Sequence, residues 1–242
     1  MKRFPSIVCF SVICSIFFST SALAESVNSG VKSVDVYNYH YEYYSSISSS
    51  SGTVSGTTTA QVAKDGVVNG SAPAGYMGVY PRLYDSSGTL IKSGSWGYTP
   101  STSSAIVSTR LDAPDRGTYY SKGQVRFYNG NGYDTYTTNA TPNMQQSSTY
   151  ALATHQINEN NMTYGSALFL DVELDLIQAK GVSGHLGYVK SSDLEGKVPT
   201  SLQEALLLEY YTPPFREIPL YAEDGNTIID TFIIEKTVVI GH

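Results

Sequence analysis

The sequence predicts a mainly β protein, with an antiparallel β-sandwich followed by a small α+β module that contains one helix. Three observations favour this fold. Short segments alternate apolar and polar residues, turn signals recur about every 8–12 residues, and convincing helical periodicity occurs only near the C-terminal end. The 242-residue chain is also rich in tyrosine and glycine, with 20 and 21 residues respectively. These two residue types suit short strands joined by tight turns.

The clearest β-hairpin is predicted over residues 117–138. Val125 and Phe127 alternate with polar neighbours, which is the period of a strand with one buried face and one solvated face. Asn and Gly fill positions 129–132, and both residue types tolerate the positive φ angles of hairpin turns. A second alternating run begins at Tyr133. We therefore expect two strands joined by this turn.

A row of alternating tyrosines follows the start of the predicted β domain. Its members are Tyr37, Tyr39, Tyr41 and Tyr43, and the intervening residues are Asn38, His40 and Glu42. An alternating aromatic strand usually buries its rings, so we expect the tyrosines to face the core and the polar residues to face water. The alternative is a row of exposed rings that stack on sugars.

Further strands are predicted throughout residues 25–142, which we assign to the β-sandwich. Residues 53–68 show strand character with a turn at Asp65-Gly66, and a second hairpin turns at residues 85–88. Residues 105–111 form another expected strand. Turn signals this frequent are typical of sandwiches and barrels.

The pattern changes after Pro142. Residues 143–159 are polar and are predicted to be a linker, and residues 160–242 are predicted to form the α+β module. The helix of this module begins with the capping box formed by Ser201 and Glu204, and it ends before Pro213.

The first 24 residues have the features of a secretory signal peptide. Lys2 and Arg3 precede the apolar run 7–18, and Ala22 and Ala24 fit the small-residue cleavage pattern. The apolar run is shorter than the roughly 20 residues of a membrane-spanning helix. We therefore expect cleavage after Ala24 and a secreted protein, either extracellular or associated with the cell wall, that keeps no transmembrane anchor.

The charge and cysteine content of the expected mature chain argue against nucleic acid and cysteine-ligated metal as partners. Removing Lys2 and Arg3 from the 15 basic residues leaves 13 against 21 acidic residues, a net charge of −8. An acidic chain is a poor partner for nucleic acid. Both cysteines, Cys9 and Cys14, fall within the predicted signal, so the mature chain has no disulfide and no cysteine-ligated metal.

Two groups of motifs carry a resemblance to known proteins. The first comprises residues 75–78, 82–84, 86–88, 117–123 and 128–133, and the second comprises residues 187–189, 191–194, 218–221 and 224–225. The first group resembles uncharacterised Tyr/Gly-rich secreted β proteins of Gram-positive bacteria. The second is similar to a C-terminal module of exported Firmicute proteins. The resemblance implies a Gram-positive source and secretion, and it supplies no catalytic residue.

Few residues suggest catalysis or metal binding. The histidines His40, His155, His185 and His242 lack the spacing of metal ligands, and no G-x-S-x-G motif is present. Asp171, Glu173 and Asp175 alternate as on the solvent face of a strand, and their spacing is not that of an EF-hand. We expect no metal, no cofactor and no catalytic residue.

The primary hypothesis is therefore a non-enzymatic protein that binds cell wall, a glycan, or another surface such as an extracellular protein. The candidate ligand-binding residues are Tyr128, Tyr133 and Tyr136, beside the turn at residues 129–132. Tyrosine offers a rigid apolar ring and a polar hydroxyl. One alternative is a secreted antagonist or bacteriocin-like protein. A second is a hydrolase, because catalytic residues that are scattered along a sequence form no visible motif.

Overall fold

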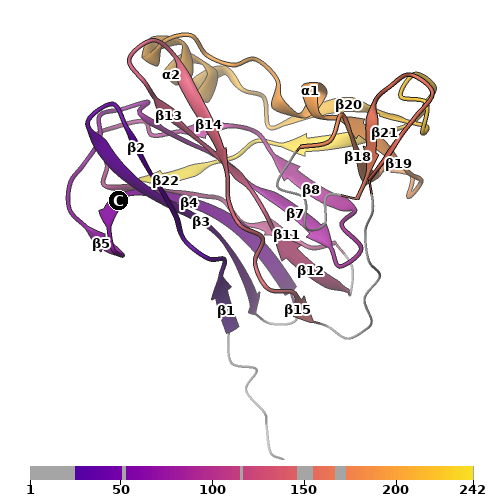
Figure 1. Ribbon diagram of the computed structural model, residues 1–242, viewed down its shortest axis with the longest axis horizontal. Helices are drawn as coiled ribbons and strands as arrows, with labels where there is room; N and C mark the ends of the chain where they lie inside the picture. The colour runs from indigo at the N-terminus through magenta and orange to yellow at the C-terminus, as the bar shows by residue number, and fades with distance from the viewer. Residues whose placement is uncertain (1–24, 51–52, 115–116, 146–154, 167–172, 242) are drawn as a thin grey trace, which may run out of the picture.

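The computed structural model describes residues 25–50, 53–114, 117–145, 155–166 and 173–241. The predicted signal peptide and its cleavage site at Ala24 lie outside the described residues. The fold is mainly β, as predicted, and the described residues form three hydrogen-bonded sheets and two helices (Figure 1).

An eight-stranded sheet contains the first five strands of the chain. Its central order is β1-β3-β4-β10-β22, and β2, β5 and β11 pair at its margins. The strands are β1 (Glu25–Asn28), β2 (Lys32–Val36), β3 (Tyr39–Ser50), β4 (Thr53–Lys64), β5 (Val67–Val68), β10 (Ala105–Ser108), β11 (Leu111–Asp112) and β22 (Val239–Gly241). The C-terminal strand β22 thus pairs antiparallel with β10 of the N-terminal part.

A four-stranded sheet has the order β14-β13-β6-β9. Its strands are β6 (Met77–Tyr80), β9 (Gly97–Tyr98), β13 (Gln124–Tyr128) and β14 (Tyr133–Thr137). The hairpin β13–β14 is the one predicted from the sequence. Tyr128 pairs with Tyr133, and Gly130 and Gly132 between them have φ angles of 98° and 144°.

The remaining strands form a ten-stranded sheet. Its order is β15-β12-β7-β8-β21-β20-β19-β18-β17-β16. The strands are β7 (Arg82–Asp85), β8 (Leu90–Gly94), β12 (Thr118–Ser121), β15 (Met144–Gln145), β16 (His155–Ile157), β17 (Thr163–Gly165), β18 (Leu176–Lys180), β19 (Leu186–Lys190), β20 (Phe215–Tyr221) and β21 (Ile228–Glu235). Most pairs are antiparallel, but β8 lies parallel to β21 and to β18.

Two helices lie between β19 and β20. The predicted helix is α2 (Leu202–Tyr211), and the Ser201 side chain accepts a hydrogen bond from the Glu204 backbone N–H at 3.2 Å. This bond is the expected N-cap. The structure adds a shorter helix, α1 (Ser191–Glu195), which ends at Gly196.

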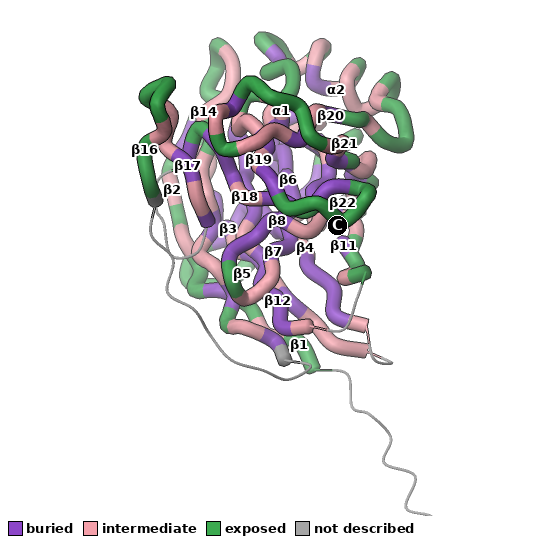
Figure 2. The backbone as a smooth tube through the Cα atoms, turned by 90° about the vertical axis from the view of Figure 1, so that its right-hand side faces the viewer, coloured by how far each residue is buried: buried purple, intermediate pink, exposed green. Residues whose placement is uncertain are grey.

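The eight-stranded sheet packs face to face on the other two sheets. One buried cluster joins Tyr41, Tyr43 and Ile106 of this sheet to Val79 and Phe127 of the four-stranded sheet. A second cluster joins Ile47, Val54 and Leu111 to residues of the ten-stranded sheet. Figure 2 shows the buried residues gathered in these central strands and the exposed residues mainly in the connections. This arrangement is the expected sandwich.

Short connections carry the chain directly between the four-stranded and the ten-stranded sheet. Pro81 separates β6 from β7, and Lys122-Gly123 separates β12 from β13. A Cβ atom at Gly123 would lie 2.0 Å from Thr58 Oγ1 and 2.7 Å from the Tyr80 carbonyl oxygen. Only glycine therefore fits where the bent strand crosses β4.

Strand β8 comes from the N-terminal part of the chain but pairs with strands β21 and β18 of the C-terminal part. The strands β8, β21, β20, β19 and β18 follow one another in the sheet, and an additional pairing of β8 with β18 closes them into a ring. Leu90 of β8 is buried in the same cluster as Ile177, Val189 and Phe232 of the later strands. The segments 25–142 and 160–242 thus share strands and a core across the segment 143–159, and residues 146–154 of that segment lie outside the described residues.

The tyrosine row divides between core and surface. Tyr41 and Tyr43 are buried, as predicted, and Tyr39 is half-buried. Tyr37 is 48% exposed because it occupies the turn between β2 and β3 instead of a strand. The expectation that Glu42 faces water is wrong. Its carboxylate is buried and accepts hydrogen bonds from the Gly66 backbone N–H at 3.0 and 3.1 Å, because the β4–β5 turn folds over it.

Arg82 lies buried where the two parts of the chain meet. Its guanidinium lies 4.5 Å from the centre of the Tyr80 ring, and Nη1 lies 2.8 Å from Oε1 of Glu173. Burial is the largest single effect and lowers the pKa of Arg82, but Glu173, Tyr80 and Tyr84 together outweigh it and raise this pKa above its usual value. Glu173 lies at the surface, as predicted, but its side chain is only 26% exposed and forms this ion pair with the buried Arg82.

Arg126 forms a second buried connection. Its side chain is 1% exposed and lies 3.9 Å from the centre of the Trp96 ring. Nε donates to Thr135 Oγ1 at 3.0 Å, and Nη2 lies 3.8 Å from Oε2 of Glu195, which ends α1. Each arginine thus joins an N-terminal strand to a carboxylate of the C-terminal part.

We expect Glu173→Gln to lower the free energy of unfolding by about 3–5 kcal/mol, because it leaves a buried guanidinium without its counter-ion. Urea unfolding followed by circular dichroism measures this. The matched control is Glu235→Gln, which breaks the ion pair between Lys92 and Glu235, two side chains that are 28% and 45% exposed. The control should cost less than about 1 kcal/mol. Equal losses in the two variants would contradict the role assigned to Arg82.

Candidate functional site

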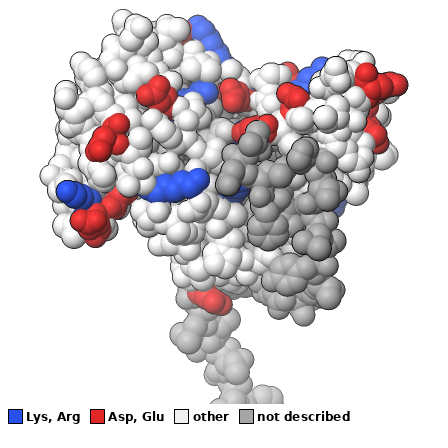
Figure 3. All heavy atoms as spheres, viewed as in Figure 1, with Lys and Arg blue, Asp and Glu red and all other residues white. Residues whose placement is uncertain are grey.

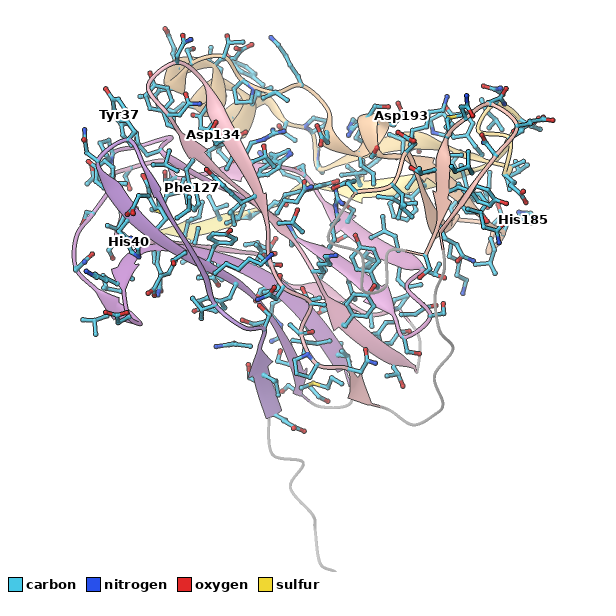
Figure 4. The ribbon with its side chains drawn as sticks, viewed as in Figure 1. Tyr37, His40, Phe127, Asp134, His185 and Asp193 are labelled. Atoms are coloured by element: carbon cyan, nitrogen blue, oxygen red, sulfur yellow. The ribbon has the colours of Figure 1, made fainter. Side chains whose placement is uncertain are left out.

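Five tyrosine rings meet at the tips of two hairpins. We name them the tyrosine-tip cluster, and its members are Tyr37, Tyr39, Tyr76, Tyr128 and Tyr133. They come from the β2–β3 turn, the start of β3, the residue before β6, the end of β13 and the start of β14. Figure 4 labels Tyr37 and Asp134 of β14 at the end of the molecule that carries these tips.

The rings of the cluster are in mutual contact. Tyr128 lies 5.1 Å from Tyr76, 5.7 Å from Tyr37 and 5.7 Å from Tyr133, measured between ring centres. Tyr39 lies 5.7 Å from Tyr76 in an edge-to-face arrangement. Aromatic pairs prefer such edge-to-face and tilted geometries, so the rings hold one another in place.

The backbone of the β2–β3 turn brings Tyr37 to this surface. Val36 pairs with Tyr39, which leaves Tyr37 and Asn38 as a two-residue turn with φ angles of 44° and 69°. Two consecutive positive φ angles are typical of a type I′ hairpin turn, in which asparagine is favoured. A Cβ atom at Gly130 would lie 2.7 Å from the Tyr37 ring, so glycine in the facing turn permits the contact between the two tips.

Hydrogen bonds fix the orientation of two rings. The Tyr133 hydroxyl donates to the Gly75 carbonyl oxygen at 2.7 Å, and the Tyr128 hydroxyl donates to the Gly130 carbonyl oxygen at 2.9 Å. Asn129 Nδ2 donates to Asp134 Oδ1 at 2.8 Å beside them. The β13–β14 turn therefore holds the Tyr128 ring, the segment before β6 holds the Tyr133 ring, and amide and carboxylate groups lie beside them.

Two tyrosines of the cluster, Tyr76 and Tyr133, have raised pKa values. Burial, followed by the nearby Tyr37 and Tyr39, raises the pKa of Tyr76 above its usual value. Burial also raises the pKa of Tyr133, with Tyr98 and Tyr128 adding to the effect. Neutral hydroxyls both donate and accept hydrogen bonds, so the surface combines apolar ring area with uncharged polar groups.

Two of the three predicted ligand-binding residues meet in the cluster. Tyr128 and Tyr133 belong to it, whereas Tyr136 lies on the other face of β14 because residues three apart in a strand point to opposite sides. The Tyr136 ring lies 5.9 Å from Tyr43 and 6.0 Å from Phe127, against the sandwich core. Only the two residues beside the turn thus remain candidates.

The cluster also contains Tyr37 and Tyr39, for which exposed sugar-stacking rings are the alternative interpretation of the sequence, and Tyr76, which is not among the predicted ligand-binding residues. The signal for Tyr37 was the Tyr37-Asn38 dipeptide, because asparagine favours the positive φ of a two-residue turn. A turn at this position would have separated Tyr37 from the buried row. The position of Tyr76 depends on pairing between β6 and β13, which are separated by many residues in sequence.

The described histidines and carboxylates form isolated pairs and no larger metal-binding cluster. His40 pairs with Asp35 at 2.6 Å, and His185 lies 3.3 Å from Asp230. Figure 4 shows these two histidines at opposite ends of the molecule. Among the described residues, no group of three or more His, Cys, Asp and Glu side chains could hold a metal ion. Asp175 accepts hydrogen bonds from Thr163, and Asp171 lies outside the described residues.

Within the described ranges, no helix has the length and apolar character needed to cross a membrane. Comparison of the chain with protein-family models, curated proteins and solved structures gives no match.

The buried tyrosines predict loss of stability at alkaline pH. Burial raises the pKa of Tyr84 to about 12, and it raises the pKa values of Tyr41 and Tyr120 further. An unfolded tyrosine has a pKa of about 10. The stabilisation is therefore fully present below pH about 10 and is lost as the pH rises toward the folded values.

Spectrophotometric titration of the tyrosines, with circular dichroism in parallel, measures this effect. We expect part of the 20 tyrosines to ionise only when the protein unfolds. Ionisation of all of them in a single step near pH 10, with the folded signal unchanged, would contradict the burial described above.

Proposed function

We propose that this protein is a secreted, non-enzymatic binding protein that contacts a saccharide of a cell-wall polymer through the tyrosine-tip cluster. The observation that carries the proposal is the meeting of five tyrosine rings at two facing hairpin tips, with Tyr37 48% exposed. The signal-like N-terminal sequence supports export, and the cluster supports recognition at a surface.

The chemistry of the cluster suits a neutral sugar. Sugar rings present apolar C–H faces and hydroxyl groups together, and tyrosine matches both with its ring and its hydroxyl. Asn129 and Asn131 are exposed beside the rings and supply amide donors and acceptors. The formal net charge of −6 disfavours a polyanionic ligand such as nucleic acid.

The rigidity of the tip also supports binding. Both turns are held by the ring contacts and by the hydroxyl bonds of Tyr128 and Tyr133. A surface that is ordered before the ligand arrives loses little side-chain entropy on binding, so more of the contact energy remains as affinity. We therefore place the binding surface at the hairpin tips.

The test replaces two rings without disturbing the backbone. In Tyr37→Asn the new residue tolerates the positive φ of the turn, and in Tyr128→Thr it suits a strand. We expect the double variant to bind insoluble cell-wall polysaccharide at least about ten-fold more weakly than the wild type, since aromatic side chains often dominate a binding surface. Co-sedimentation with peptidoglycan, chitin and cellulose measures the affinity.

The control is Tyr210→Ser/Tyr211→Ser, which removes two exposed tyrosines of α2 whose rings lie 5.0 Å apart. This variant should bind as the wild type does. Tyr136→Thr should lower the melting temperature and keep the affinity, because that ring packs against Tyr43 and Phe127. Equal loss in the α2 control, or no retention of the wild type on any of the three polymers, would overturn the proposal.

A further inference from the structure

A cavity lies at the junction of the N-terminal and C-terminal parts, apart from the tyrosine-tip cluster. Its volume is about 320 Å³. Its walls come from the β8–β9 connection, the segment after α1, the end of α2 and the strands β20 and β21. The lining residues are Ser95, Trp96, Tyr98, Leu194, Glu195, Gly196, Lys197, Leu208, Thr212, Pro213, Arg216, Ile234 and Lys236. In the space-filling view the surface is notched beside α1, and both basic and acidic side chains occur around the notch (Figure 3).

Trp96 forms a rigid wall of this cavity. Its ring stacks on Tyr80 at 5.1 Å with an interplanar angle of 25°, and the Arg126 guanidinium lies 3.9 Å from its centre. Two neighbours thus fix the orientation of the ring. Its Nε1 is buried and has no hydrogen-bond partner in the described part of the chain, so a polar donor remains unused at the cavity wall.

The charges that line the cavity are predominantly positive. Lys197, Arg216 and Lys236 oppose the single carboxylate of Glu195. Lys197 is paired with Glu204, and Glu195 is paired with Arg126. These two pairs are therefore satisfied within the protein.

Arg216 and Lys236 are held by backbone carbonyl groups. Arg216 Nη2 donates to the Leu194 carbonyl oxygen at 3.1 Å, and Lys236 Nζ donates to the Glu209 carbonyl oxygen at 2.9 Å. Neither forms an ion pair with a described residue. The nearby Glu209 carboxylate accepts a hydrogen bond from the Tyr98 backbone N–H at 3.1 Å; burial raises its pKa, and this bond and the charge of Lys236 oppose the rise. Arg216 and Lys236 thus place two positive charges in the wall of one cavity of an acidic protein.

The other walls of the cavity are apolar. Leu194, Leu208, Pro213 and Ile234 contribute aliphatic surface. The volume lies near the lower end of the range for small-molecule pockets, about 300–1,000 Å³. We propose that this cavity binds a small organic carboxylate, with the carboxylate against Arg216 and Lys236 and a short apolar chain against the aliphatic wall. The proposal is independent of saccharide binding at the hairpin tips.

Trp96 is the only tryptophan of the chain, so its fluorescence reports directly on the cavity. The probe is hexanoate, and hexanamide is the control of equal chain length without the charge. We expect hexanoate to change the tryptophan emission in a saturable way. Hexanamide should bind about ten-fold or more weakly, because a charge-assisted hydrogen bond to a buried anion is replaced by a neutral one.

Two variants locate the anion. Arg216→Gln and Lys236→Gln should each weaken hexanoate binding about ten-fold and leave the weak hexanamide binding unchanged, while Lys64→Gln on the exposed end of β4 should have no effect. Thermal melts verify that the variants are folded. If Arg216→Gln is unstable, Lys236→Gln alone tests the position of the anion. No saturable change with hexanoate, equal affinity for hexanamide, or equal loss in Lys64→Gln would overturn the proposal.

Discussion

The ion pair between the buried Arg82 and Glu173 is the interaction on which the rest of the structure depends. Arg82 cannot lie in the sandwich without a counter-ion, because an uncompensated buried charge costs several kcal/mol. The counter-ion comes from a segment 91 residues later in the chain. Gln124 links the same carboxylate to β13 through a hydrogen bond of 2.5 Å. The N-terminal part therefore needs the C-terminal part to complete its own core.

Several further contacts also join the N-terminal part to the C-terminal part. Arg126 contacts Glu195, the Tyr80 hydroxyl donates to the Leu194 carbonyl oxygen, and β8 closes the ring of five strands. Both proposed binding surfaces depend on this joining. The junction cavity has walls from both parts, and Tyr133 of the tip cluster packs against the cluster that contains Ile177 and Phe232.

The local features of the fold could be predicted from the sequence, and its long-range pairing could not. Period-two alternation, the Asn-Gly turn before Tyr133 and the capping box at Ser201 act within a few residues, so their consequences are visible in the sequence. The closure of β8 against β18 depends on which edges meet in space. Glu42 was expected in water because charged side chains are seldom buried without partners, and its partner, the Gly66 backbone N–H, lies 24 residues later in the sequence. Tyr128 and Tyr133 were predictable from the turn, whereas their meeting with Tyr76 requires the pairing of β6 with β13.

Differential scanning calorimetry of the chain from residue 25 onward tests most directly whether the two parts form one cooperative unit. Shared strands and a shared core predict one transition, in which the calorimetric enthalpy equals the van't Hoff enthalpy. Two resolved transitions, or a calorimetric enthalpy well above the van't Hoff value, would show that residues 25–142 and 160–242 unfold separately. That result would contradict the central role of the ion pair between Arg82 and Glu173.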